Sequence, residues 1–169
     1  MKQLYLVRHA KSSWSEPSLA DFDRPLNKRG KRNAPFMGKR LRDKEICPDL
    51  LISSGAKRAR KTAGIIAREI GYPKDKIVIT NALYTADMMD LLEIVREMDK
   101  QFDNVMLVGH NYVITEFAEW LTGTLLGNIP TSGIACIQFD HPWKKVSESS
   151  GSLLFFDYPK LHEDGSKRE

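Results

Sequence analysis

Residues 105–121, VMLVGHNYVITEFAEWL, contain the pattern that decides the fold. The four apolar residues at the start of this segment predict a strand that is covered on both faces, as the strands of parallel sheets are. After Gly109, apolar side chains recur from Val113 to Leu121 with the spacing of one face of a helix. The segment therefore predicts a strand and a helix joined by a short turn, and this turn contains His110.

The same alternation of apolar strand and helix continues outward in both directions. Further strands are expected at 3–7, 50–52, 77–79, 134–139 and 153–156, and further helices at 28–43, 59–70 and 88–98. This order favours a mostly parallel sheet with helices on both faces. Residues 141–152 are polar and lack a helical period, so we expect an antiparallel pairing at the end of the sheet. The predicted fold class is a three-layer α/β/α sandwich.

The length and composition indicate one globular domain. The chain has 169 residues, of which 41% are hydrophobic and 28% charged, and we expect a domain over residues 1–160 and a polar tail over 161–169. Its two cysteines form neither a disulfide framework nor a metal-binding spacing. No apolar run approaches the roughly 20 residues of a membrane span, and no signal-like segment begins the sequence. We therefore expect a cytoplasmic protein that does not bind membranes.

The positive charge is concentrated in one part of the chain. Residues 24–61 contain thirteen basic and three acidic residues, whereas the whole sequence has a net charge of only +4. Such a stretch can attract nucleic acid or smaller phosphorylated molecules. It is also compatible with helix faces that are simply solvated.

Residues able to hold a phosphoryl group follow three of the expected strands. Arg8 and His9 follow the first strand, Arg58 lies shortly after the second, and His110 follows the fourth. Loops at the carboxyl ends of parallel strands meet at one edge of the sheet, where ligands bind. Guanidinium groups bind phosphoryl oxygens, and a neutral imidazole is a nucleophile. The four side chains together predict a phosphoryl-transfer site.

Other common sites fit less well. Neither the phosphate-binding loop of nucleotide hydrolases nor the glycine-rich dinucleotide fingerprint is present. A catalytic zinc ion needs a third protein ligand beside His9 and His110, and neither His141 nor His162 follows an expected strand of the parallel sheet. We therefore expect a site that needs no metal or cofactor.

Four segments, in this order, carry a family resemblance. They are Arg8-His9-Ala10, the stretch from Asp23 to Gly30, the stretch from Ser53 to Ala63, and Val108-Gly109-His110-Asn111. They resemble the motifs of the histidine phosphatase superfamily, whose founders are the cofactor-dependent phosphoglycerate mutases. The short SixA-type phosphohistidine phosphatases are the most similar branch. The resemblance implies a phosphoglycerate mutase-like fold and a single histidine phosphatase domain.

The resemblance also implies roles for the site residues. His9 would accept the phosphoryl group covalently, and Arg8, Arg58 and His110 would bind its oxygens and stabilise the transition state. Ser12 is a further candidate for a phosphate contact because it lies two residues after Ala10.

The proton donor is less well defined. Larger members of the family carry a glutamate shortly after the third strand, whereas the nearest carboxylate here is Asp87. Asp87 is either the proton donor or the residue that begins the following helix. In the long loop after the first strand, Trp14 is expected to be a packing residue. Arg24 is expected to contact the substrate, to support a residue that does, or to be only a solvated charge.

Three functions remain open from the sequence. The short chain and the missing glutamate favour hydrolysis of phosphohistidine on a protein, because the leaving nitrogen of a phosphoramidate is readily protonated. One alternative is a phosphomonoesterase or mutase that acts on a small phosphorylated metabolite. The other is a basic nucleic-acid-binding module, although nucleic acid is not the expected partner. The sequence does not define an oligomeric state.

Overall fold

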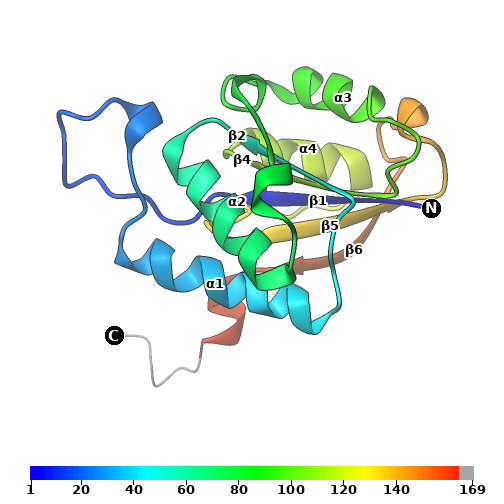
Figure 1. Cartoon of the computed structure of the whole chain (residues 1–169). Helices are drawn as coiled ribbons and strands as arrows, with labels where there is room; N and C mark the ends of the chain where they lie inside the picture. The colour runs from blue at the N-terminus through cyan, green and yellow to red at the C-terminus, as the bar shows by residue number, and fades with distance from the viewer. Residues whose placement is uncertain (164–169) are drawn as a thin grey trace.

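The computed structural model describes residues 1–163 and shows a six-stranded sheet between layers of helices (Figure 1). The main elements are β1 (Lys2–Arg8), α1 (Lys28–Asp43), β2 (Leu50–Ser54), α2 (Lys57–Ile70), β3 (Val78–Thr80), α3 (Met88–Arg96), β4 (Asn104–Gly109), α4 (Val113–Thr122), β5 (Ile134–Phe139) and β6 (Ser152–Asp157). Short 3₁₀ turns are η1 (Asp21–Asp23), η2 (Lys74–Lys76), η3 (Asn81–Leu83), η4 (Trp143–Lys145) and η5 (Pro159–His162). The predicted elements are confirmed to within about two residues at their ends.

The sheet has the strand order β3-β2-β4-β1-β5-β6. Strands β1, β2, β3 and β4 are parallel to their neighbours within this group. Strand β5 is antiparallel to both β1 and β6, so the antiparallel strand lies one place in from the edge of the sheet. The carboxyl ends of the four parallel strands therefore meet at one edge, as the sequence predicted.

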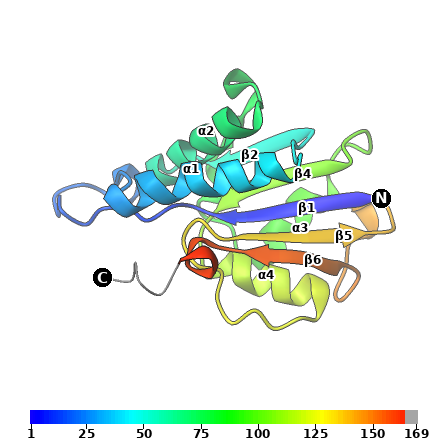
Figure 2. The same ribbon diagram turned by 90° about the horizontal axis from the view of Figure 1, so that it is seen from below.

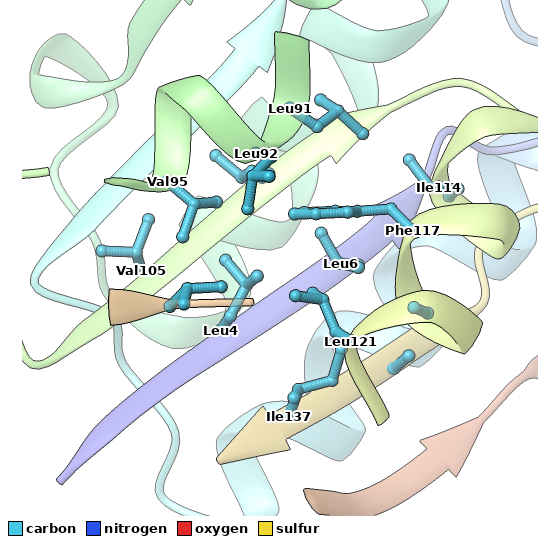
Figure 3. Packing of buried hydrophobic residues seen from close by; sticks show 14 of the residues in the cluster. Leu4, Leu6, Leu91, Leu92, Val95, Val105, Ile114, Phe117, Leu121 and Ile137 are labelled. Carbon is cyan, nitrogen blue, oxygen red and sulfur yellow. The ribbon is translucent and has the colours of Figure 1, made fainter. Parts of the chain in front are cut away.

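The two faces of the sheet are covered by different helix pairs, and Figure 2 shows α1 and α2 on one side and α3 and α4 on the other. Alternate residues of β1 enter separate cores: Leu4 and Leu6 pack with α3 and α4, whereas Tyr5 and Val7 pack with α1 and α2. Phe117 of α4 lies over the first of these cores (Figure 3). Burial of each such side chain contributes about 1.5–3 kcal/mol.

Helix α1 is fixed against the loop that follows β1. The side chain of Asn27 caps the helix by accepting a hydrogen bond from the backbone N–H of Gly30 at 2.9 Å. A Cβ atom at Gly30 would lie 2.2 Å from the carbonyl oxygen of Lys11, so only glycine allows this close approach. The start of α1 thus holds the first residues of the long loop in place.

The end of the described chain packs against α1 and β6. His162 in η5 hydrogen-bonds to the carboxylate of Asp157, and its ring lies 5.9 Å from that of Phe36. Regular structure therefore continues two residues past the expected domain boundary at residue 160. Residues 164–169 of the expected tail lie outside the described residues.

Candidate active site

The geometry around His9 defines which ring nitrogen is available for chemistry. Its Nδ1 atom lies 2.8 Å from the carbonyl oxygen of Ala10. Because a carbonyl can only accept, Nδ1 carries the proton, and the lone pair is on Nε2. Burial is the main cause that lowers the pKa of His9 to about 3, and the charges of Arg58 and Arg8 act in the same direction. The ring is therefore neutral at physiological pH, with its nucleophilic nitrogen free of a proton.

Ala10, which directly follows His9, lies in a closely packed part of the backbone. Its backbone N–H donates to Thr62 Oγ1 at 2.9 Å, and its side chain is fully buried beside Leu26 and Ala34. Ala10 is not among the residues with positive φ. The local backbone therefore accommodates alanine without the strain that a left-handed conformation would bring.

Arg58 lies between His9 and a carboxylate that the sequence analysis missed. Its Nε is 3.4 Å from Nε2 of His9, while its Nη1 and Nη2 donate to the carbonyl oxygen and the carboxylate of Asp21 at 2.6 and 2.9 Å. Asp21 also accepts hydrogen bonds from Tyr84 Oη at 2.7 Å and from Arg24 Nε at 3.1 Å. The hydrogen bond from Tyr84, followed by Arg58, lowers the pKa of Asp21 to about 2.

His110 and Arg8 complete the site. The rings of His110 and His9 are 5.1 Å apart, and Nε2 of His110 lies 2.8 Å from Ser54 Oγ. Burial lowers the pKa of His110 to about 4, and Arg58 adds to the effect. Two buried atoms, Nδ1 of His110 and Nε of Arg8, have no hydrogen-bond partner in the part of the chain that the structure describes.

These groups surround a cavity of about 480 Å³ at the carboxyl edge of the sheet. The long loop after β1, blue in Figure 1, forms part of its wall. The cavity is lined by Arg8, His9, Lys11, Ser12, Trp14, Asp21, Arg24, Arg58, Tyr84, His110, Asn111 and Thr131. All four residues of the predicted phosphoryl-transfer site are in this set, and so is Ser12, whose Oγ accepts a hydrogen bond from Arg24 at 2.8 Å.

Asp87 does not line this cavity. Its carboxylate accepts a hydrogen bond from the backbone N–H of Asp90 at 2.8 Å, and the Asp90 carboxylate accepts one from the backbone N–H of Asp87 at 3.0 Å. The two residues form a capping box at the start of α3. The sequence left Asp87 either as a proton donor or as the residue that begins the helix, and this geometry matches the second role.

The prediction that Trp14 is a packing residue is wrong. Trp14 is 71% exposed at the mouth of the cavity. One face of its indole is covered by Arg24, whose Cζ lies 3.5 Å from the ring centroid. Trp14 belongs to none of the hydrophobic core clusters of the described residues, and the loop places it beside the charged Arg24.

The arrangement can bind and attack a phosphoryl group. Guanidinium and imidazole N–H groups surround the free nitrogen of His9, and fixed donors of this kind stabilise the charge on the oxygens of a transferring phosphoryl group. No group of three or more His, Cys, Asp or Glu side chains within residues 1–163 could hold a metal ion. No helix in the same range is long and apolar enough to cross a membrane.

The chain is similar in sequence to a known protein family. The sequence model of the histidine phosphatase superfamily (branch 1) matches residues 4–102. An uncharacterized chloroplastic protein of Arabidopsis thaliana is 30% identical over 159 residues, which cover 89% of this chain and 72% of that protein. An uncharacterized protein of Mycobacterium leprae is also 30% identical, over 91% of this chain and 100% of its own length.

A solved structure extends the similarity to nearly the whole fold. The crystal structure of a SixA protein from Agrobacterium tumefaciens, named as a candidate phosphohistidine phosphatase, has a TM-score of 0.81 and 30% sequence identity. The similarity covers 94% of this chain and 98% of the other. With a family match over more than half of the sequence and relatives that span almost all of it, the chain belongs to the histidine phosphatase superfamily.

Proposed function

We propose that the protein is a metal-independent phosphatase that uses His9 as its nucleophile. Nε2 of His9 attacks phosphorus, the bond between phosphorus and the leaving group breaks, and the leaving atom keeps the electron pair and takes a proton. Water then attacks the phosphohistidine and releases inorganic phosphate, which regenerates His9. The observation that carries this proposal is the 2.8 Å contact between Nδ1 and the Ala10 carbonyl, because it leaves Nε2 unprotonated beside Arg58.

The unpartnered donors support binding of the phosphoryl oxygens. Ser54 Oγ accepts a hydrogen bond from the backbone N–H of Ala56 at 3.2 Å, so its own hydroxyl is available to donate to Nε2 of His110. His110 then carries its proton on Nδ1, the buried atom without a partner. Together with Nε of Arg8, this nitrogen supplies donors that a phosphoryl group can satisfy.

Asp21 is better placed than Asp87 to give a proton to the leaving group. Its carboxylate lines the cavity, whereas Asp87 is engaged at the start of α3. Tyr84 and Arg58 keep Asp21 ionised. A phosphoryl group that binds Arg58 competes for this donor and repels the carboxylate, and both effects raise the pKa of Asp21. We propose that Asp21 takes up a proton in this way and delivers it to the leaving atom.

A protein that carries phosphohistidine is the proposed substrate. The 30% identity to a protein named as a candidate phosphohistidine phosphatase supports this class. Helices α1 and α2 contain twelve basic and two acidic residues, and both begin near the cavity. Their charge favours an anionic partner. Hydrolysis of a small phosphorylated metabolite is the second candidate, because the cavity is large enough to enclose part of such a molecule.

The test is a rapid-quench search for the phosphoenzyme with a phosphohistidine peptide and with several sugar phosphates. We expect an acid-labile, base-stable phosphoenzyme that forms fastest from the peptide and is absent in His9→Ala. If the phosphoenzyme forms fastest from a sugar phosphate, the substrate is a small metabolite and not a phosphohistidine protein. If a phosphoenzyme still forms in His9→Ala, then His9 is not the nucleophile. The rate should be unchanged by chelators, and RNA binding with a steep salt dependence would support the non-enzymatic alternative instead. A cytoplasmic location stays a prediction that cell fractionation can check.

A further inference from the structure

Trp14 is an exposed aromatic residue at the mouth of the proposed active site. Tryptophan is rarely exposed to this extent, because its large apolar surface is stabilised by burial. Trp14 is 71% exposed although Arg24 lies over one face of its indole. Most of the indole is therefore open to solvent, and Trp14 lines the cavity that also contains His9.

The exposed indole has a rigid support. Arg24 is buried, and its guanidinium is held by Ser12 Oγ at 2.8 Å and by the Asp21 carboxylate at 3.1 Å. The backbone beside the indole is also fixed, because the N–H of Ser13 donates to the carbonyl oxygen of Pro25 at 2.8 Å. A side chain held in this way loses little conformational freedom when a ligand binds to it.

The support connects Trp14 to the groups proposed to bind phosphate. The carboxylate of Asp21 accepts hydrogen bonds from Arg24 through Oδ1 and from Arg58 through Oδ2, and Arg58 contacts His9. The indole is thus held in a fixed relation to the nucleophile. His9 and Trp14 line the same cavity, so a phosphoryl bound at His9 and the group attached to it share that cavity with the indole.

We propose that Trp14 binds the leaving group of the substrate by stacking on a planar aromatic ring, and that this ring is the imidazole of phosphohistidine. This inference rests on the proposed phosphatase function and assigns the subsite for the departing ring. The indole takes no part in bond making: the P–N bond breaks, the electron pair stays on the imidazole nitrogen, and that nitrogen takes the proton. Stacking favours aromatic over aliphatic leaving groups, because offset aromatic rings attract each other beyond the effect of buried area.

The test compares two phosphoramidates that share the P–N bond but differ in the ring. Phosphohistidine has an aromatic leaving group, and phospholysine has an aliphatic one. In Trp14→Leu we expect kcat/KM for phosphohistidine to fall about fivefold to tenfold, mainly through a higher KM, because aromatic pairs contribute on that scale. For phospholysine the change should be less than about twofold, and Trp14→Phe should recover most of the activity toward phosphohistidine.

A matched control is Leu125→Ala, which removes a side chain that is 86% exposed and does not line the cavity. Leu125→Ala should leave kcat/KM unchanged for both phosphohistidine and phospholysine. An equal loss for both substrates in Trp14→Leu, or no loss for either, would overturn the inference, and so would Trp14→Phe behaving like Trp14→Leu. These outcomes leave the phosphatase proposal intact as long as the wild-type protein hydrolyses both compounds. If the wild type hydrolyses neither, the proposed function itself fails.

Discussion

Two clusters at the same edge of the sheet combine an aspartate with arginine and histidine, but they are built differently. In one cluster, Asp21 holds Arg58 beside His9, and the groups surround a cavity. In the other, at the end of β6, Asp157 accepts hydrogen bonds from Arg40 Nε at 2.7 Å and from the ring of His162. Residue types and position at the carboxyl edge therefore do not by themselves make a site.

The difference lies in which polar atoms remain unpaired. Asp157 is only 6% exposed, and both of its carboxylate oxygens accept hydrogen bonds. Around His9, by contrast, Nδ1 of His110 and Nε of Arg8 are buried without partners in the part of the chain that is described. Unpaired buried donors are costly unless a ligand satisfies them. The comparison supports the proposal that the first cluster serves binding and catalysis, whereas the second serves stability.

The largest expected effect is the difference in activity between the alanine variants of the two histidines, His9 and His162. His9→Ala should lower kcat for an activated aryl phosphate by at least about 10⁴-fold, because no other group can form the covalent intermediate. His162→Ala should leave kcat unchanged. Steady-state kinetics on both variants would check this, together with thermal unfolding to show that both are folded. A fully active His9→Ala protein would remove the distinction between the clusters.

The two arginines give the next largest contrast. Arg58→Ala should cost about 2 to 4 kcal/mol of transition-state stabilisation, which is the effect of losing a fixed donor to a developing negative charge. Arg40→Ala removes the arginine partner of Asp157 and should lower the free energy of unfolding while kcat/KM stays within about twofold of wild type. The measurement is kcat/KM and urea unfolding on each variant. Equal losses of activity in both would mean that Arg40 also acts on the site.

Exchange of each aspartate for asparagine should lower activity in only one of the two clusters. Asp157→Asn should lower the free energy of unfolding by about 2 kcal/mol, because it weakens two hydrogen bonds in a buried cluster, and it should leave kcat unchanged. Asp21→Asn should lower activity, and the loss should be larger for substrates with poor leaving groups than for aryl phosphates. An Asp21→Asn variant with the same loss on every substrate would indicate that Asp21 only positions Arg58.

Much of this organisation could be predicted from the sequence because it depends on local pattern. The uniformly apolar runs of β1 and β4 and the helical spacing in α4 are decided within a few residues, and α1 has the predicted bounds despite Pro35. The parallel order then places Arg8, Arg58 and His110 at one edge, because the carboxyl ends of parallel strands always meet. The approach of these residues to one another at that edge follows from the strand order.

The missed residues depend on contacts between segments that are far apart. Asp21 lies in a loop without periodicity, and its partner Tyr84 is 63 residues away. The neighbouring sequence does not distinguish Asp21 from Asp23. The only indication in the sequence was that the long loop carries acidic residues while the predicted site is rich in arginine. The error at Trp14 has the same origin, because a loop tryptophan packs only if the tertiary structure brings apolar neighbours to it.

The smallest expected effect is a difference in the pH range over which each cluster contributes to stability. Burial lowers the pKa values of His9 and His110 to about 3 and 4, whereas an unfolded histidine titrates near 6.5. The unfolded chain therefore binds protons first, and each neutral histidine stabilises the fold above about pH 6.5. This contribution is lost as pH falls, by about 1 kcal/mol per histidine between pH 6.5 and 5.5.

The contribution of the Asp157 cluster to stability should change at lower pH than that of the two histidines. Burial raises the pKa of the Asp157 carboxyl, but the hydrogen bonds from Arg40 and His162 outweigh burial and hold the pKa below its usual value. Its stabilising effect is thus fully present above the unfolded pKa of about 3.9 and is lost as pH falls through the lower folded value. Urea unfolding between pH 7 and 3 should show a flatter pH dependence above pH 4.5 for His110→Gln and a flatter one below pH 4 for Asp157→Asn. If His110→Gln follows the wild-type curve down to pH 4.5, then His110 is not held neutral by burial, and its proposed role as a neutral donor through Nδ1 fails with it.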